Sequence, residues 1–138
     1  LSIEQNVKNE ISIKWAGANN PLWYIQNATW HEIKANKQPI GKTDNPAPFT
    51  THELVLQKGD SLYMFTDGYA DQFGGPKGKK FKYKQLNDLL GSHSHLTFME
   101  QRDRLNTIFE EWKNWQATDV SKSGLEQVDD VLVIGIKL

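Results

Sequence analysis

The stretch SLYMFTDGYAD, residues 61–71, joins an apolar run to an acidic segment that contains a glycine. The run at 61–65 is typical of a buried strand. An aspartate-glycine pair follows it, and such pairs are common in ordinary turns. The segment alone therefore allows a purely structural interpretation, and a functional one requires a partner for Asp67 and Asp71 elsewhere in the chain.

That partner lies near the other end of the sequence. Asp129 and Asp130 directly precede VLVIGIKL, residues 131–138, whose β-branched and mostly apolar side chains predict a buried strand. If this strand lies antiparallel beside the one at 61–65, the end of one is level with the start of the other. Asp67 and Asp129 would then meet at one edge of the sheet.

Carboxylates that meet in this way repel each other, and a divalent cation would remove the repulsion. Oxygen ligands select Mg²⁺ or Mn²⁺. Gly68 would let the backbone or a water molecule approach closely. On the residues alone, a cation site at Asp67 and Asp129 and a plain turn both remain open.

Composition excludes several function classes. The chain has 138 residues, so one domain is expected. Its 16 basic and 17 acidic residues nearly balance, which gives no indication of binding to nucleic acid or to an anionic membrane. The absence of cysteine excludes a disulfide scaffold and a thiolate metal site. No apolar stretch approaches the roughly 20 residues that span a bilayer, so we expect no membrane contact by this segment.

Strand patterns dominate the first half of the chain. Alternation in EISIKW, residues 10–15, predicts a strand, and the segments at 22–27 and 29–35 predict a hairpin. A second hairpin is expected between ELVLQ, residues 53–57, and the strand at 61–65, because a Lys-Gly-Asp turn separates them. These segments predict a largely antiparallel sheet.

A helical pattern follows the glycine-rich segment. One apolar helix face extends from Phe81 to Leu90 and is ended by Gly91. A capping box that begins at Thr97 starts a second helix of about five turns, residues 98–115. Strands, two helices and a last strand predict an α+β fold, in which both helices pack on one face of a largely antiparallel sheet.

Four pieces of sequence, in the right order, resemble one enzyme family. GDSLYMFTDGYAD, residues 59–71, with VDDVLVIGIKL, residues 128–138, resembles the C-terminal part of the metal-dependent, 2C-type serine/threonine phosphatases. WAGANNPLWYI, residues 15–25, and the later QPIG resemble the bacterial branch typified by the stage II sporulation E phosphatase. DQFGGPKGKKFKYKQL, residues 71–86, resembles versions at the ends of bacterial sensor proteins. The resemblance extends from about residue 11 to residue 138.

The resemblance implies half of the αββα sandwich of the 2C-type phosphatases. Residues 1–138 are then expected to be the C-terminal part of one phosphatase-like domain, whose N-terminal half is absent. In this family, two cations per complete domain, Mn²⁺ or Mg²⁺, activate a water that hydrolyses phosphoserine or phosphothreonine on a regulatory protein. Because the family's remaining ligands come from the absent half, this segment alone is expected to be inactive.

The resemblance also implies roles for the acidic residues. The aspartate of the family's Asp-Gly pair is a metal ligand and matches Asp67, with Gly68 beside it. The first aspartate before the last strand is another ligand and matches Asp129. Asp130, where related enzymes often have asparagine, is expected to orient the metal ligands without binding the metal itself. Asp71 matches an acidic position that some members use for a third, weaker metal, although many bacterial members have glutamate there.

Two further groups of residues have open interpretations. Asn19 and Asn20 either face the substrate phosphate or form a hydrogen-bonded turn. The lysine run within residues 77–84 either steers a phosphorylated or acidic partner or is a solvated surface.

The resemblance implies a phosphorylated protein as the partner and a cytoplasmic location, with the cytoplasmic end of a membrane-bound sensor as one setting. A non-catalytic module that has a phosphatase-like fold and binds a regulatory partner is the alternative. Loss of neighbouring strands would leave unpaired edges and apolar surface, so we also expect the segment to self-associate.

Overall fold

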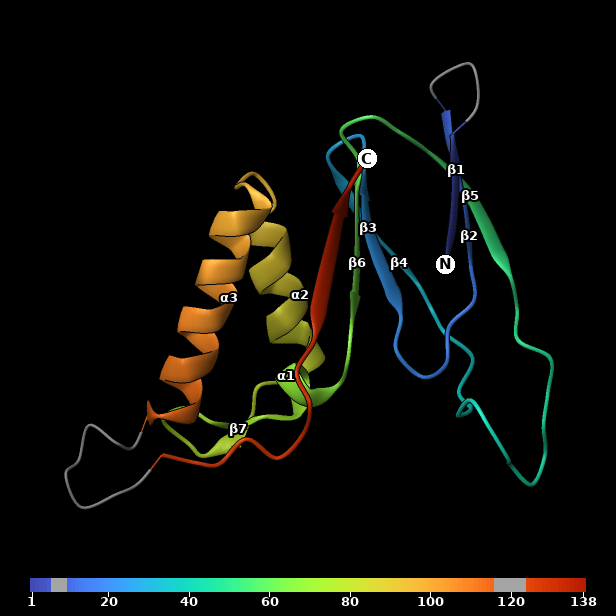
Figure 1. Ribbon diagram of the computed structural model, residues 1–138. Coiled ribbons are helices and arrows are strands. Elements are labelled where there is room, and N and C mark those ends of the chain that lie inside the picture. Colours follow the sequence, from blue (N-terminus) through green and yellow to red (C-terminus); the bar gives the residue numbers. More distant parts are fainter. Residues whose placement is uncertain (6–9, 116–123) are drawn as a thin grey trace. The chain divides into compact units, whose positions relative to one another are not determined.

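The computed structural model describes residues 1–5, 10–115 and 124–138 (Figure 1). The chain divides into two compact units. The first consists of Leu1–Phe65 together with Val133–Leu138, and the second is Thr66–Leu132. Strands make up the regular structure of the first unit, whereas the described helices belong to the second. The predicted α+β class with antiparallel strands is confirmed.

The first unit contains two antiparallel sheets. The smaller sheet has the order β1-β2-β5, with β1 at Ser2–Gln5, β2 at Glu10–Trp15 and β5 at His52–Gln57. The larger sheet has the order β4-β3-β6-β9, with β3 at Leu22–Gln26, β4 at Thr29–Ile33, β6 at Ser61–Phe65 and β9 at Val133–Lys137. Figure 1 shows β6 and β9 side by side. Their antiparallel pairing places Phe65 opposite Val133.

One hydrophobic cluster joins these two sheets. Its buried members come from β2, β3, β5 and β6 and are Ile11, Ile13, Trp15, Leu22, Leu56 and Leu62. Alternate residues of β2 are buried, as the period of its sequence predicts. Burial of a large apolar side chain contributes about 1.5–3 kcal/mol, so this cluster stabilises the packing of the two sheets.

The hairpin predicted at 22–35 is present. Asn27 and Ala28 connect β3 and β4 with φ angles of 50° and 59°. A two-residue turn with positive φ at both positions matches the right-handed twist of the strands. The second predicted hairpin is wrong, because β5 pairs with β2 whereas β6 pairs with β3 and β9.

Asp60 explains why the chain turns between β5 and β6 without forming a hairpin. Its side chain is 6% exposed and accepts hydrogen bonds from the backbone N–H groups of Gln57, at 2.8 Å, and Asn27, at 3.0 Å. Asp60 N–H donates to the Gln57 carbonyl, at 3.0 Å. A turn therefore forms locally, and the buried carboxylate ties it to the β3–β4 turn, so β6 enters the other sheet.

The last strand is less buried than its composition predicts. β9 pairs with β6 and, in the part of the chain that is described, has no partner on its other edge. Ile134 is 40% exposed, and Val133 and Ile136 are half-buried. The expectation of a buried strand is wrong because β-branched residues suit edge and central strands alike. The free edge of β9 carries backbone groups that could pair with a strand of another chain. Self-association therefore stays a prediction.

The second unit contains three helices and one short hairpin among its described residues. The helices are α1 at Gly68–Asp71, α2 at Tyr83–Ser92 and α3 at Phe98–Lys113. The hairpin pairs β7, Phe73–Gly74, with β8, Lys79–Lys80. Aromatic rings join these elements, since Tyr69 contacts Phe81 and Phe109 at centroid distances of 5.1 and 5.0 Å.

Several helix boundaries differ from those expected. The one-turn helix α1 replaces the expected turn after β6, Phe81 precedes α2, and Gly91 lies inside α2 instead of ending it. α3 stops at Lys113, so Trp115 lies beyond it. Phe81 lies outside α2 because its N–H donates to the Gln72 carbonyl, at 2.9 Å, in place of a helical acceptor.

The capping box at the start of α3 is confirmed. Thr97 Oγ1 accepts from the Glu100 N–H at 3.3 Å, and Glu100 Oε2 accepts from the Thr97 N–H at 2.8 Å. Hydrogen bonds from the side chain and backbone of Thr97 lower the pKa of Glu100. The second unit thus has one helix whose start is stabilised by purely local chemistry.

We expect Asp60→Ala to lower the free energy of unfolding by about 1–3 kcal/mol, because two backbone N–H groups lose a buried acceptor. Urea denaturation measures the change. Asp44→Ala, which removes an exposed loop carboxylate, is the control and should leave the midpoint unchanged. Equal midpoints for the two variants would refute the role given to Asp60.

We expect Thr97→Ala to destabilise the protein by about 1 kcal/mol at neutral pH. Because the pKa of Glu100 is lowered in the folded state, the stability that it adds is present above its unfolded pKa. That part is lost as the pH falls through the folded pKa. The difference between wild type and Thr97→Ala should therefore shrink in acid. Urea midpoints at neutral and at acidic pH give this comparison, and a difference that grew in acid would contradict it.

Candidate metal centre

The residues that directly follow β6 and precede β9 are tied together by hydrogen bonds. The Thr66 N–H donates to the Leu132 carbonyl at 3.0 Å, and the Leu132 N–H donates to Thr66 Oγ1 at 3.0 Å. Thr66 Oγ1 in turn donates to the Asp130 carbonyl at 2.8 Å. One threonine therefore binds the segment that carries Asp129 and Asp130 to the segment that carries Asp67.

Gly68 packs directly against the backbone of the segment that carries Asp130. A Cβ atom at this position would collide with the backbone carbonyl oxygen of Asp130 and would lie 2.9 Å from its carbon. Gly68 is buried, so a side chain has no free space to occupy. The glycine of the Asp-Gly pair is thus required by packing in this structure, in addition to any turn geometry.

Asp67 stands at the beginning of α1. Its carbonyl accepts the Asp71 N–H at 2.9 Å, whereas its side chain makes no capping hydrogen bond and is exposed. Asp129 is exposed as well, and its Oδ1 accepts the Asp130 N–H at 2.8 Å, which fixes the direction of the carboxylate. Both side chains therefore keep oxygen atoms available to a cation.

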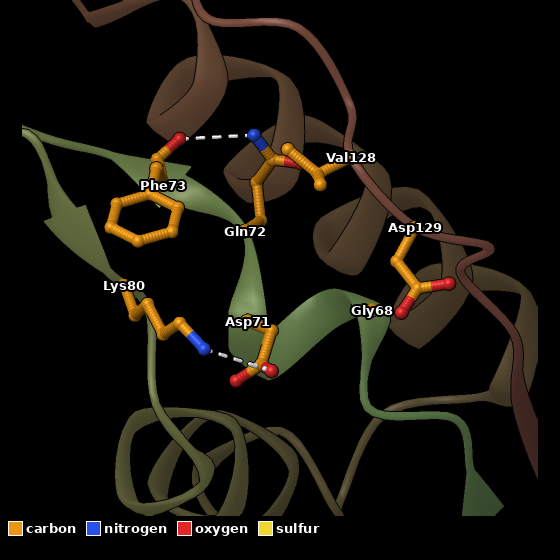
Figure 2. A pocket seen from close by; sticks show the side chains of 7 residues that line it. All are labelled: Gly68, Asp71, Gln72, Phe73, Lys80, Val128 and Asp129. Atoms are coloured by element: carbon orange, nitrogen blue, oxygen red, sulfur yellow. Dashed lines mark hydrogen bonds and ion pairs between the residues drawn. The ribbon is translucent and has the colours of Figure 1, made fainter.

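A pocket of about 100 Å³ lies beside these aspartates (Figure 2). It is lined by Gly68, Asp71, Gln72, Phe73, Lys80, Val128 and Asp129. Asp67 is not among the lining residues, although it immediately precedes Gly68. The structure thus brings Asp71 and Asp129 to one cavity and leaves Asp67 at the start of the adjoining helix.

Gln72 supports the segment that leads to Asp129. Its side chain is buried, and Nε2 donates to the carbonyls of Phe73 and Glu126 at 3.0 and 3.1 Å. The Gln72 carbonyl accepts from Trp112 Nε1 at 3.1 Å. Sequence reasoning missed Gln72, because a polar residue between a helix and a hairpin gives no signal of its distant partners.

Tyr83 is a second residue that sequence reasoning missed. Burial, and then the negative charges of Asp67 and Asp71, raise the pKa of Tyr83 to about 12. The hydroxyl therefore stays protonated at physiological pH and remains within the electrostatic field of both carboxylates. The only signal in the sequence is its place at the start of α2, and that place does not predict proximity to Asp67.

The donor set suits a hard divalent cation but is incomplete. Asp67 and Asp129 offer carboxylate oxygens, which Mg²⁺ and Mn²⁺ prefer. Among the described residues, no group of three or more histidine or acidic side chains is close enough together to hold a metal ion. A cation bound here would need further oxygen ligands from water or from other protein segments.

Asn19 and Asn20 belong to the first unit, where they form a tight turn. The Asn19 N–H donates to the Asn36 carbonyl at 2.8 Å, and the Asn20 N–H donates to the Ala18 carbonyl at 2.7 Å. Asn19 has a φ of 61°, which asparagine tolerates better than most residues. This geometry agrees with the turn interpretation, while contact with a phosphate stays a prediction.

Comparison with known proteins identifies the family. The family model described as Stage II sporulation protein E (SpoIIE) matches residues 5–138. The chain belongs to the SpoIIE family. No curated protein matches the chain significantly.

Solved structures show that this SpoIIE-family chain has the fold of part of a PP2C phosphatase domain. The SiaA-PP2C domain of Pseudomonas aeruginosa matches with a TM-score of 0.73 and 25% identity, over 94% of this chain and 47% of that one. The phosphatase domain of the cell fate determinant SpoIIE from Bacillus subtilis matches with a TM-score of 0.59 and 15% identity, over 99% and 56%. A Mn-presoaked structure of that domain matches with a TM-score of 0.57 and 15% identity, over 99% of this chain and 55% of that one.

The SpoIIE-family chain spans about half the length of the solved structures that it matches. The match to the family model confirms the predicted resemblance, and the similarity to the solved structures confirms the predicted fold. None of the helices in the described ranges is long and apolar enough to cross a bilayer.

We expect Gly68→Ala to destabilise the SpoIIE-family chain by about 1–3 kcal/mol, because the new methyl group forces the Asp130 backbone away. Gly41→Ala is the steric control, because its added Cβ would have no atom of a non-adjacent residue within 4 Å, although its φ of 130° will itself add some strain. Thermal unfolding measures both variants. A smaller loss for Gly68→Ala than for Gly41→Ala would contradict the close approach.

Proposed function

We propose that this chain is the C-terminal part of a metal-dependent protein serine/threonine phosphatase domain. The single observation that carries the proposal is the set of hydrogen bonds among Thr66, Leu132 and the Asp130 carbonyl. It joins the segments of Asp67 and Asp129, the two residues that the family resemblance matches to metal ligands. Membership of the SpoIIE family and the PP2C fold support the reaction class.

In this proposal Asp67 and Asp129 hold Mn²⁺ or Mg²⁺ from adjacent segments, two cations being held by a complete domain. When bound, the cations supply an activated water and offset the negative charge of the phosphoryl group. The Asp130 N–H orients the Asp129 carboxylate, at 2.8 Å, and Gly68, which has no side chain, permits the close contact of the two segments. Burial, and then the charges of Asp67 and Asp71, raise the pKa of Tyr83 to about 12, so Tyr83 adds no negative charge to that of these carboxylates.

The substrate in this proposal is a phosphoserine or phosphothreonine residue of a regulatory protein, in a cytoplasmic signalling pathway. Hydrolysis by a water needs no protein nucleophile, which agrees with a chain that has no cysteine. The described residues alone provide no group of three metal-binding side chains. We therefore also propose that this segment has no activity without the rest of the domain.

A non-catalytic regulatory module is the second candidate, and the incomplete donor set favours it. The two candidates differ in cation binding. A catalytic domain needs Asp67 and Asp129 as ligands, whereas a module that only binds a partner has no need for a cation at this place.

We expect Asp67→Asn and Asp129→Asn each to weaken Mn²⁺ binding more than about tenfold, since each removes a charged ligand. Calorimetric titration of the protein with Mn²⁺ measures this, and Asp88→Asn, which changes an exposed carboxylate on α2, is the control. Equal affinities for all three variants would contradict the metal site. Turnover of a phosphopeptide by this chain alone in Mn²⁺ would contradict its incompleteness.

A further inference from the structure

The carboxylate of Asp71 already has a cationic partner within the protein. Lys80 Nζ lies 3.0 Å from Asp71 Oδ2, and Figure 2 shows the two side chains directed toward each other in the pocket that Asp129 also lines. The family resemblance matches Asp71 to a ligand of a third metal. In the structure its carboxylate forms an ion pair with Lys80.

The β7–β8 hairpin places Lys80 at this position. Phe73 lies opposite Lys80, and the Gly78 N–H donates to the Gly75 carbonyl at 3.2 Å, which closes the turn. Gly75 and Gly78 have φ angles of 65° and 58°, which glycine adopts without strain. The pairing therefore fixes the register of Lys80 with respect to the end of α1.

A backbone hydrogen bond directly after β8 also fixes the position of this strand relative to α1. The Lys82 N–H donates to the Ala70 carbonyl at 2.6 Å, although Lys82 has a φ of 77° and a ψ of 147°, a conformation that is nearly restricted to glycine. This strain persists because the surrounding hydrogen bonds determine the path of the chain. The result brings Lys80 within reach of Asp71.

The ammonium group of Lys80 is held from a second side as well. Its Nζ lies 5.8 Å from the centroid of the Phe73 ring, a distance at which a cation and an aromatic face attract each other. Lys80 Nζ thus lies close to both the ring of Phe73 and the carboxylate of Asp71. A cation that approached Asp71 would have to displace this ammonium group or bind beside it.

We propose that Lys80 takes the place of a third metal at Asp71, so that Asp71 binds no metal in this protein. The inference rests on the proposed function, because it concerns the cation set of that same site. Lys80 neutralises Asp71 and leaves Asp129 as the other carboxylate that lines the pocket. It is a positioning residue that restricts divalent cations to Asp67 and Asp129.

The ion pair affects cation binding much more than folding. The side chains of Lys80 and Asp71 are 45% and 44% exposed, and ion pairs with such exposure add little to stability. Removal of the lysine should therefore leave a folded protein with one unpaired carboxylate beside Asp129. A positive charge near a cation site repels a divalent ion, so its removal should allow a cation to bind at Asp71 or should raise the affinity of the neighbouring site for Mn²⁺ by roughly tenfold.

The test is a calorimetric titration with Mn²⁺ of wild type and six variants, two of which, Asp71→Asn and Asp129→Asn, each change a single carboxylate of the pocket. Lys80→Met removes the charge, Lys80→Arg keeps it, and Lys80→Met/Asp71→Asn removes the ligand as well. Lys79→Met is the matched control, because neighbouring side chains on a strand point to opposite faces. Circular dichroism establishes that each variant is folded.

We expect Lys80→Met to gain one Mn²⁺ site, or to bind Mn²⁺ roughly tenfold more tightly than wild type. No such gain is expected for the double variant Lys80→Met/Asp71→Asn, or for the single variants Lys80→Arg and Lys79→Met. Equal binding by wild type and Lys80→Met would overturn the inference. The inference would also be overturned if the single variant Asp71→Asn bound one Mn²⁺ fewer than wild type. This comparison can be made even if Lys80→Met does not fold.

The two proposals fail separately in this experiment. Wild-type binding that is insensitive to Asp129→Asn argues against the proposed metal site. The difference between Lys80→Met and wild type tests only the role of Lys80, since Asp129 is present in both proteins.

Discussion

The antiparallel pairing of β6 with β9 is the constraint on which the rest of the structure depends. It joins residues that are about seventy positions or more apart, from Phe65 opposite Val133 to Ser61 opposite Lys137. Thr66 and Leu132, the next residues, are also hydrogen-bonded to each other. Because loop closure over such a distance is entropically costly, the pairing must be stabilised by apolar burial. Leu62 on β6 provides part of that burial as a member of the core cluster.

The chemistry follows from where this pairing ends. Hydrogen bonds from Thr66 hold the two acidic segments together, and Gly68 permits their contact. The carboxylates of Asp67 and Asp129 remain exposed, whereas that of Asp71 is paired with Lys80. Three aspartates that look equivalent in the sequence therefore have different electrostatic surroundings. In the proposed phosphatase, that difference decides which of them receive a cation.

Local patterns predicted a large part of the fold. The alternation in β2, the turn at Asn27 and Ala28 and the capping box at Thr97 each depend on neighbouring residues, and each is present. The β5–β6 hairpin was predicted wrongly because Asp60 bonds to Asn27, a distant residue that no local pattern reveals. The burial of β9 was overestimated for a related reason: composition does not tell an edge strand from a central one.

The sequence indicates which acidic residues are candidates for the site but does not indicate their partners. An aspartate beside a glycine after an apolar run, and a second aspartate before another run, indicate where oxygen ligands would gather. The pairing of Lys80 with Asp71 depends on the register of a hairpin that has only two residues in each strand. A strand of two residues is too short to show an alternation of apolar and polar residues. The buried amide of Gln72 likewise depends on contacts with remote segments.

The most direct test of the central claim is a Mg²⁺ titration followed by carbon NMR of the aspartate side-chain carboxyl groups. If Asp67 and Asp129 share the cation site, their signals will shift together with one midpoint, while those of Asp71 and Asp88 change little. Shifts of Asp67 and Asp129 at clearly different Mg²⁺ concentrations, or a shift of only one of them, would contradict a shared site.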